Sequence, residues 1–386
     1  MTAQSNNLDL SQYLRREPAM LAILSFIAIV FFLAVTAISH LYFGQQDALA
    51  LRWSSRGNAD LNSHRYDAAI SEYRAALLYS RDNFDYRLGL ARALMGTHRT
   101  AEAYAYFINL WGRHPENGVV NVELARIAAE RGETAEALRY YHNAIYANWP
   151  AGQESQGRET RFELVEYLLK INSKTQAQSE LISLAAYVGE DASQQDRLGA
   201  LFLRISDNDH AFAAFHRELI ANPHDVTALT GAGDAAYEMG RYVLAVRYLQ
   251  QAVDFNPHDY ISNDRLRTAR FVIELDPFRP QIRVADRNRK VIDAFAAGGD
   301  RLKACPVAAS YGAKAGATGK PAQDLSEQWA SLKPKITAGG LRRDPDLVDT
   351  AMNLVFTIER QASEWCGTPN DKDAALLLIA KLHEGN

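Results

Sequence analysis

The chain has 386 residues, of which 47% are hydrophobic and 23% are charged, as in ordinary folded proteins rather than disordered ones. Its formal net charge of −4 gives no reason to expect a nucleic-acid partner, because such partners usually require a basic surface. Its two cysteines, Cys305 and Cys366, are too few for a four-thiolate zinc site or for a cysteine-held iron–sulfur cluster within this chain.

The first predicted element is a transmembrane helix over residues 19–43, after an N-terminal segment at 1–18. Residues 19–39 contain no charged side chain, and about 20 apolar residues are enough to cross about 30 Å of hydrocarbon as a helix. Tyr42 and Phe43 lie where interfacial aromatic residues are expected. A soluble buried helix fits less well, because no charged residue interrupts the run on any face.

The flanking basic residues predict the orientation of this helix. Arg15 and Arg16 precede the run, whereas the next basic residue after it is Arg52, which favours a cytoplasmic N-terminus and an exported remainder. In a bacterium this is the inner membrane, with the rest of the chain in the periplasm. A cleaved signal peptide is an alternative, because Val35-Thr36-Ala37 resembles a small-residue cleavage site. A twin-arginine signal lacks further support around the arginine pair.

After the apolar segment the sequence repeats with a stride of 34 residues, interrupted by one insertion at 152–157. Small residues recur at one position, where two helices approach closely, and large residues follow four positions later. The alanines in this register are Ala69, Ala103, Ala137, Ala177, Ala211 and Ala245. The large residues are Tyr73, Phe107, Tyr141, Leu181, Phe215 and Leu249.

This pattern resembles the tetratricopeptide repeat, with its W-x2-L-G-x2-Y…A-x3-F…P motif. The matching residues include Trp53, Gly57, Leu124, Leu198, Gly199, Phe202, Gly233, Pro115, Pro223 and Pro257. Arg56 stands where Leu is usual in the first unit, and the fourth unit has Val165 in place of Gly and lacks the closing Pro. The resemblance implies an all-α fold in which helical hairpins stack into a solenoid, because one hairpin cannot bury its apolar face alone.

The solenoid is expected over residues 50–276. Its units are expected at about 50–83, 84–117, 118–151, 158–191, 192–225 and 226–259, followed by a capping helix at 260–275. The fourth unit departs most from the motif, so a kink is expected there.

A small helical domain is expected at 278–386, where the repeat period is lost. Gln281 to Ala297 is predicted to be a helix that Gly298-Gly299 ends, and residues 308–321 form a loop. A short helix follows at 322–332. Asp344-Pro345 is expected to start a helix that reaches about Trp365, and Asp371 is expected to cap the last helix.

In an exported protein the natural interpretation of Cys305 and Cys366 is a disulfide. Closing a loop of about 60 residues would stabilise the fold by roughly 4 kcal/mol in the chain-entropy description. Two unpaired buried thiols are one alternative. A redox or intermolecular role is another, although no Cys-x-x-Cys spacing supports redox catalysis.

No motif for catalysis or for a cofactor is found, and neither an enzyme nor a metal site is expected. His64 and His98 share one turn position, and His224 and His258 share another, about 10 Å apart in successive units. That spacing is too long for shared zinc ligands. The glycine-rich stretch at 312–320 lacks the Gly, Ser/Thr and preceding strand of a phosphate-binding loop.

The resemblance implies that the first helix of each unit lines the inner wall of the solenoid. One equivalent position on that wall is expected to hold Asn58, Arg92, Arg126, Glu166, Ala200 and Asp234. Two guanidinium groups in adjacent units suit the carboxylates of an acidic peptide or chain terminus. Ordinary solvated charges are the alternative.

We therefore expect a membrane-anchored scaffold that binds a protein or peptide partner, without nucleic acid or a small-molecule substrate. By architectural analogy, its setting would be bacterial envelope assembly or secretion. The alternative is an accessory subunit of a membrane enzyme complex, with the C-terminal helices as its docking module. An enzyme active through that region is disfavoured, because no nucleophile, base and oxyanion donor are visible together.

Overall fold

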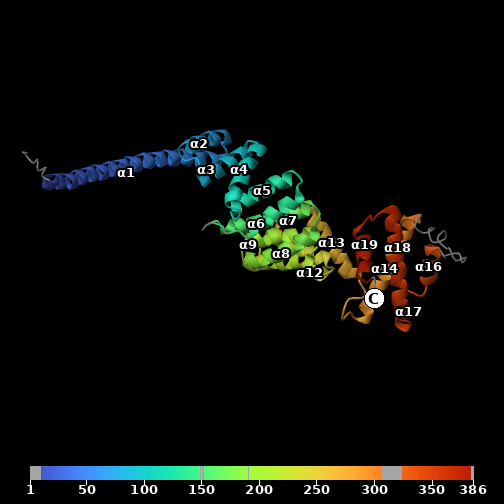
Figure 1. Ribbon diagram of the computed structural model, residues 1–386. Helices are drawn as coiled ribbons and strands as arrows, with labels where there is room; N and C mark the ends of the chain where they lie inside the picture. Colours follow the sequence, from blue (N-terminus) through green and yellow to red (C-terminus); the bar gives the residue numbers. More distant parts are fainter. Residues whose placement is uncertain (1–9, 148, 150–151, 190, 307–323, 384–386) are drawn as a thin grey trace, which may run out of the picture. The chain divides into compact units, whose positions relative to one another are not determined.

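The computed structural model describes residues 10–147, 149, 152–189, 191–306 and 324–383, and these form helices and turns without strands. The predicted all-α class is confirmed (Figure 1). The chain divides into two compact units, residues 1–164 and 165–386. Each is described by itself below.

The N-terminal helix does not end where the apolar run ends. Helix α1 is continuous from Leu10 to Asn62, so the predicted anchor and the first helix of the repeats are one element (Figure 1). Gly44 does not break it, since a single glycine costs a helix only about 1 kcal/mol. The large apolar side chains from Met20 to Phe43 are roughly half to two-thirds exposed. Within the described part of the chain, α1 is the one helix with the length and apolarity to cross a membrane.

Beyond the apolar run the described helices follow one another in pairs. Helices of successive pairs also touch, since α2 contacts α3, α4 contacts α5, α8 contacts α9 and α10 contacts α11. Within the described residues the pairs are α1 with α2 (Tyr66–Tyr79), α3 (Phe84–Gly96) with α4 (Thr100–Arg113), α5 (Gly118–Glu130) with α6 (Thr134–Ile145), α7 (Glu154–Lys170) with α8 (Lys174–Val188), α9 (Ala192–Arg204) with α10 (Asn208–Ala221), and α11 (Val226–Glu238) with α12 (Tyr242–Phe255). Helix α13 (Tyr260–Leu275) follows them.

The turn inside each pair has the same backbone geometry. One residue adopts a positive φ, and the next N–H donates to the carbonyl five residues earlier, as Arg65 does to Asp60 (2.8 Å) and Glu133 does to Ala128 (2.9 Å). This is the Schellman ending of a helix, which favours Gly or Asn but admits other residues. The left-handed residues are His64, His98, Gly132, Asn172, Ser206 and Gly240. His64 and His98 therefore occupy the same left-handed turn position of two successive repeats.

The large residue of the register fills the space between successive first helices. Tyr73 and Phe215 are at most 2% exposed. The ring of Tyr73 lies against Gly57 and Gly89, and a Cβ atom added at Gly89 would overlap it. Glycine therefore allows two first helices to close over one aromatic ring.

The insertion lengthens a helix instead of forming a separate loop. Helix α7 begins at Glu154, so it starts four residues earlier than the predicted 158. The ring of Trp149 lies against Gly118 and Gly157, and its Nε1 donates to the carbonyl of Ala144 (3.0 Å). The boundary between the two compact units falls inside α7, after Leu164.

The C-terminal helices depart from prediction at two glycines. Helix α14 (Val284–Ala304) runs through Gly298-Gly299 instead of ending there. A Cβ atom at Gly299 would overlap the ring of Trp329, whose Nε1 donates to the carbonyl of Phe295 (2.9 Å). Gly299 therefore serves close packing against α16 (Leu325–Leu332), while a Cβ atom at Gly298 would contact Val355, and neither glycine ends the helix.

Other parts of this region also differ from prediction, and α14 itself begins at Val284 rather than at Gln281. A short helix, α17 (Ala338–Arg343), was not expected. Helix α18 (Leu347–Cys366) starts two residues after Pro345, because Asp344 instead accepts from the N–H of Asp346 (3.2 Å). Asn370, not Asp371, caps α19 (Asp371–His383), accepting from the N–H groups of residues 372 and 373 at 3.0 Å. The predicted loop at 308–321 lies outside the described residues.

The hydrophobic core continues from the last repeat into the C-terminal helices. Helix α19 packs on α13 and α18 packs on α14. One buried cluster includes Val272 of α13, Val291 of α14, Val355 of α18 and Ile379 of α19. The predicted division at 276–278 is therefore not a boundary of the core.

Candidate functional site

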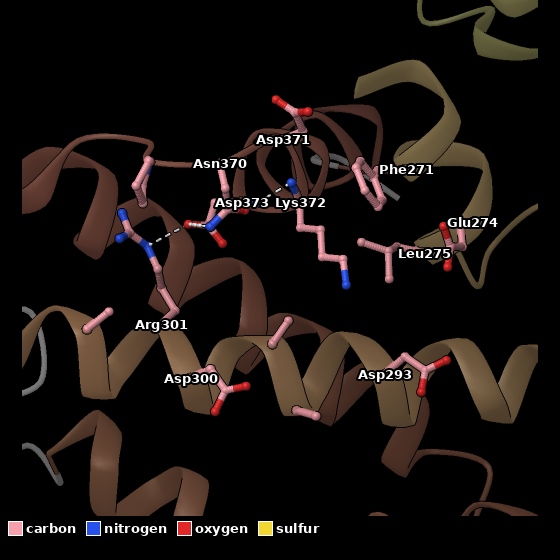
Figure 2. A pocket seen from close by; sticks show the side chains of 14 residues that line it. Phe271, Glu274, Leu275, Asp293, Asp300, Arg301, Asn370, Asp371, Lys372 and Asp373 are labelled. Atoms are coloured by element: carbon pink, nitrogen blue, oxygen red, sulfur yellow. Dashed lines mark hydrogen bonds and ion pairs between the residues drawn. The ribbon is translucent and has the colours of Figure 1, made fainter. Parts of the chain in front are cut away.

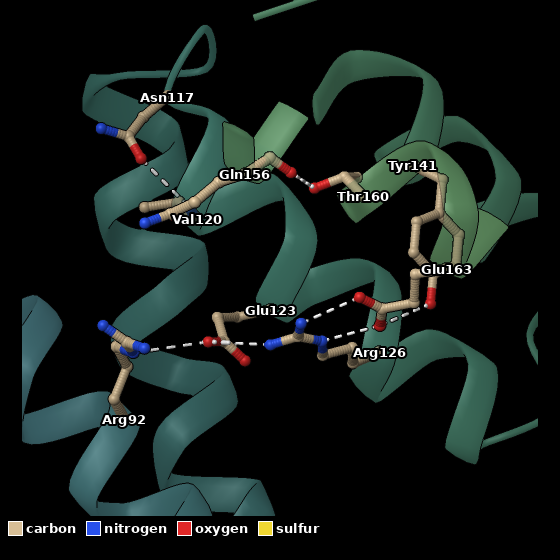
Figure 3. Close-up of polar contacts among 9 residues, drawn as sticks. All are labelled: Arg92, Asn117, Val120, Glu123, Arg126, Tyr141, Gln156, Thr160 and Glu163. Atoms are coloured by element: carbon tan, nitrogen blue, oxygen red, sulfur yellow. Dashed lines mark hydrogen bonds and ion pairs between the residues drawn. The ribbon is translucent and has the colours of Figure 1, made fainter. Parts of the chain in front are cut away.

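The predicted inner-wall row begins in the first unit with Asn58 on α1 and Arg92 on α3. The hydroxyl of Tyr73 donates to Oδ1 of Asn58 (2.5 Å). Nε of Arg92 lies 3.5 Å from Oε1 of Glu123 on α5 (Figure 3). The Arg92 side chain stays 51% exposed, whereas Glu123 is buried.

Arg126 on α5 makes the strongest contacts of the row. Its Nε and Nη2 donate to the two carboxylate oxygens of Glu163 on α7, at 2.7 and 2.8 Å (Figure 3). Its Nη1 lies 3.3 Å from Glu123, and the Tyr141 hydroxyl donates to Glu163 (3.1 Å). The hydrogen bond to Glu163 raises the pKa of Arg126. A forked pair of this kind fixes geometry as well as charge.

In the second compact unit (residues 165–386), two of the equivalent positions hold acidic residues. Oε2 of Glu166 on α7 lies 2.6 Å from Nη1 of Arg204 on α9. Oδ1 of Asp234 on α11 lies 2.6 Å from Nη1 of Arg265 on α13. Burial raises the pKa of Asp234, and Arg265 opposes that effect. Ala200 on α9 has no polar atom in its side chain.

Each charged member of the row therefore contacts the first helix of the next pair. The uncharged members of the row have glycine at the corresponding position instead. Gly89 follows Asn58 by 31 positions, Gly231 follows Ala200 by 31 positions, and each glycine lies against an aromatic ring. The sequence predicted the row but not its partner carboxylates, Glu123 and Glu163. Each glutamate follows its arginine by the same number of residues once the insertion is discounted. This constant spacing is the signal in the sequence that could have revealed the two pairs.

A second candidate site lies among the C-terminal helices. A groove of about 710 Å³ is lined by α13, α14 and the start of α19 (Figure 2). Phe271 and Leu275 form part of an apolar wall, while Asp293, Lys372 and Asp373 bring charge to it. The mixture suits a polar or charged group with an apolar stem better than a purely apolar ligand.

A buried charge cluster adjoins this groove. Nε of Arg301 lies 3.5 Å from both Oε2 of Glu359 and Oδ2 of Asp373, and all three side chains are at most 8% exposed. Burial, followed by the charge of Asp373, raises the pKa of Glu359 to about 8. Arg301 also donates to the carbonyl of Gly367.

The two cysteines form a disulfide beside the buried charge cluster. Cys305, directly after α14, is bonded to Cys366 at the end of α18, with their Cα atoms 6.2 Å apart. Cys305 is fully buried against Ala362. The disulfide therefore joins the two helices that carry Arg301 and Glu359.

Solved structures with similar folds were found at low sequence identity. YrrB, described as a tetratricopeptide-repeat protein with an unusual peptide-binding site, is 15% identical (TM-score 0.40) over 50% of this chain and 95% of that one. PilF of Pseudomonas aeruginosa is 16% identical (0.34; 58% and 92%). The TPR2AB domain of yeast Sti1 in a pHSP90 complex is 18% identical (0.28; 66% and 92%).

No curated protein matches the sequence. A model of the family described as tetratricopeptide repeat matches residues 55–117, 88–153 and 197–260. These matches cover helix pairs in which the Schellman turns and the aromatic contacts to glycine recur. Residues 55–153 and 197–260 therefore contain tetratricopeptide repeats, as the sequence predicted.

Proposed function

We propose that this chain is a membrane-anchored scaffold that holds a protein or peptide partner against the first helices of its repeats. Tetratricopeptide repeats point to protein or peptide binding, because their stacked helices present an extended surface. The first helices carry the exposed charge of the Arg92–Arg126 row. This half-exposed charged row is the observation on which the proposal rests.

We infer that α1 is a single-pass anchor in a bacterial inner membrane, with a cytoplasmic N-terminus and periplasmic repeats. The exposed apolar side chains from Met20 to Phe43 and the basic residues Arg15 and Arg16 support this arrangement. The Cys305–Cys366 disulfide fits an oxidising compartment. Since α1 is unbroken between Phe43 and Trp53, the repeats would begin about 15 Å from the end of the apolar run. Envelope assembly or secretion is the setting that we propose.

The proposed partner presents carboxylates to the N-terminal part of the row. Arg92 is the better contact, because its guanidinium is half exposed and lies 3.5 Å from Glu123, whereas Glu163 engages two nitrogens of Arg126. Neutralising the arginines should therefore weaken binding. Neutralising Glu123 and Glu163 should strengthen it, since both guanidinium groups then lack their intramolecular carboxylates.

The test is co-purification of the full chain from native membranes in mild detergent. Arg92→Gln with Arg126→Gln should lower the yield of a stoichiometric partner several-fold, and Glu123→Gln with Glu163→Gln should raise it. Arg139→Gln is the control, because Arg139 pairs with Glu136 on the second helix α6. Equal yields from all variants would refute the acidic-partner proposal.

The alternative function is that of an accessory subunit in a membrane enzyme complex, docked through the C-terminal helices. The groove beside Phe271 and Arg301 supports this alternative. In the same co-purification, partner loss on Lys372→Glu but not on Arg92→Gln would favour it.

A further inference from the structure

Three carboxylates from consecutive segments of the second unit converge at one place. Asp196 lies on α9, Glu218 on α10, and Asp225 directly before α11. One carboxylate oxygen of each lies within 4.8 Å of the others. The cluster thus joins both helices of one repeat to the first helix of the next.

Glu218 is unusual for its position in the repeat. The other units hold small or apolar residues in this register, and all of them are buried: Ala76, Leu110, Ala144, Leu184 and Ala252. Glu218 is only 3% exposed. Its Oε1 accepts from Nδ2 of Asn222 (2.7 Å), while Oε2 is buried without a hydrogen-bond partner. A buried carboxylate oxygen without a partner is costly, so this glutamate calls for a ligand that the protein's own side chains do not supply.

Within the described ranges the cluster also lacks a compensating positive charge. Among the described residues, no Lys or Arg forms an ion pair with Asp196, Glu218 or Asp225. Burial raises the pKa of Asp196 to about 6, and the charges of Asp225 and Glu218 add to that effect. The site therefore favours either a proton or a cation.

We propose that Asp196, Glu218 and Asp225 bind one divalent cation of the size of calcium. Carboxylate oxygens are hard ligands that suit calcium rather than zinc or copper. Calcium accepts several carboxylates at 2.3–2.6 Å, so opposite ligands lie about 4.6–5.2 Å apart, whereas magnesium usually retains water and takes one or two carboxylates. Asp225 caps α11 by accepting from the N–H of Ala228 (2.8 Å) through Oδ1, which leaves Oδ2 for the ion.

The position of the cluster allows an ion to enter from solvent and to link two repeats. Asp196 and Asp225 are partly exposed, so the ion enters from solvent and water completes its coordination. Because the ligands come from α9, α10 and the start of α11, the bound ion would tie two repeats together. Calcium would then raise the melting temperature of the folded chain by binding it in preference to the unfolded one.

The test uses the full chain in detergent micelles, stripped with a chelator and titrated with CaCl2 by calorimetry. Wild type should take up one calcium ion, and Glu218→Ala and Asp225→Asn should each lower the affinity at least tenfold. Asp209→Asn, an exposed carboxylate on the same helix α10, is the control and should bind as wild type.

Melting curves distinguish loss of the ion from loss of the fold. In chelator, Glu218→Ala should melt no lower than wild type, because alanine occupies this register in three other units. Calcium should raise the melting temperature of wild type but not of this variant. The proposal is overturned if wild type takes up no calcium at millimolar concentration, or if Glu218→Ala binds calcium as wild type does. Equal affinity for magnesium would overturn the assignment to a calcium-sized ion.

Discussion

Glu359 should make the stability of the C-terminal helices fall as the pH rises. Its side chain is fully buried, and its pKa is raised from the ordinary value of 4.5 to about 8. Between these values the folded chain keeps the proton that the unfolded chain releases. The folded state binds more protons, so the free energy of unfolding decreases with rising pH across this window.

The pKa values limit the size of this effect. At about 1.4 kcal/mol per pH unit, a displacement from 4.5 to about 8 corresponds to at most about 5 kcal/mol. Replacing Glu359 with Gln removes the titration while keeping the shape of the protonated acid. The variant should resemble wild type near pH 5 and be more stable by several kcal/mol near pH 8.5. Asp373, whose pKa burial also raises, acts with the same sign.

Urea unfolding of the full chain in detergent, followed by tryptophan fluorescence, measures this difference. Trp329 stacks on Phe295 with ring centroids 5.4 Å apart, so it reports on the core around α14. The difference in midpoint between Glu359→Gln and wild type should grow from pH 5 to pH 8.5. A constant difference, or a variant that is less stable at pH 8.5, would refute the reasoning.

Three further changes test the packing. Gly231→Ala places a Cβ atom against the ring of Phe215 and should cost about 1–3 kcal/mol in thermal unfolding. Gly112→Ala, which meets nothing within 4 Å in helix α4, should instead be neutral or stabilise by up to about 1 kcal/mol, and equal losses would contradict the argument. Cys305→Ser should destabilise by roughly 4 kcal/mol and change the mobility of the chain on a non-reducing gel. An unchanged mobility would show that Cys305 and Cys366 are not paired in the cell.

The repeats could be predicted from sequence because their physical demands recur at a constant spacing. A small residue is required wherever two helices close on each other, and a large one must follow it to fill the gap. Ala69 and Tyr73 show this demand, and both are buried. The Schellman turns add another periodic constraint, which His64 and Gly132 meet with the same left-handed backbone.

The C-terminal helices do not repeat, so only local rules could be applied there. Those rules failed at Gly298-Gly299, because these glycines pack against residues of other helices, Gly298 against Val355 and Gly299 against Trp329. No metal site was expected from the sequence. The site that we propose at Glu218 has no fixed motif in the chain, because the stacking of helices brings its partners Asp196 and Asp225 to it.

The partner's place on the first helices is tested most directly by photo-crosslinking in living cells. A photoreactive amino acid at position 92, on α3, should give a discrete adduct with one protein, and the same residue at position 139, on α6, should give none. No adduct at position 92, or the same adducts from both positions, would contradict the proposal that this wall holds the partner.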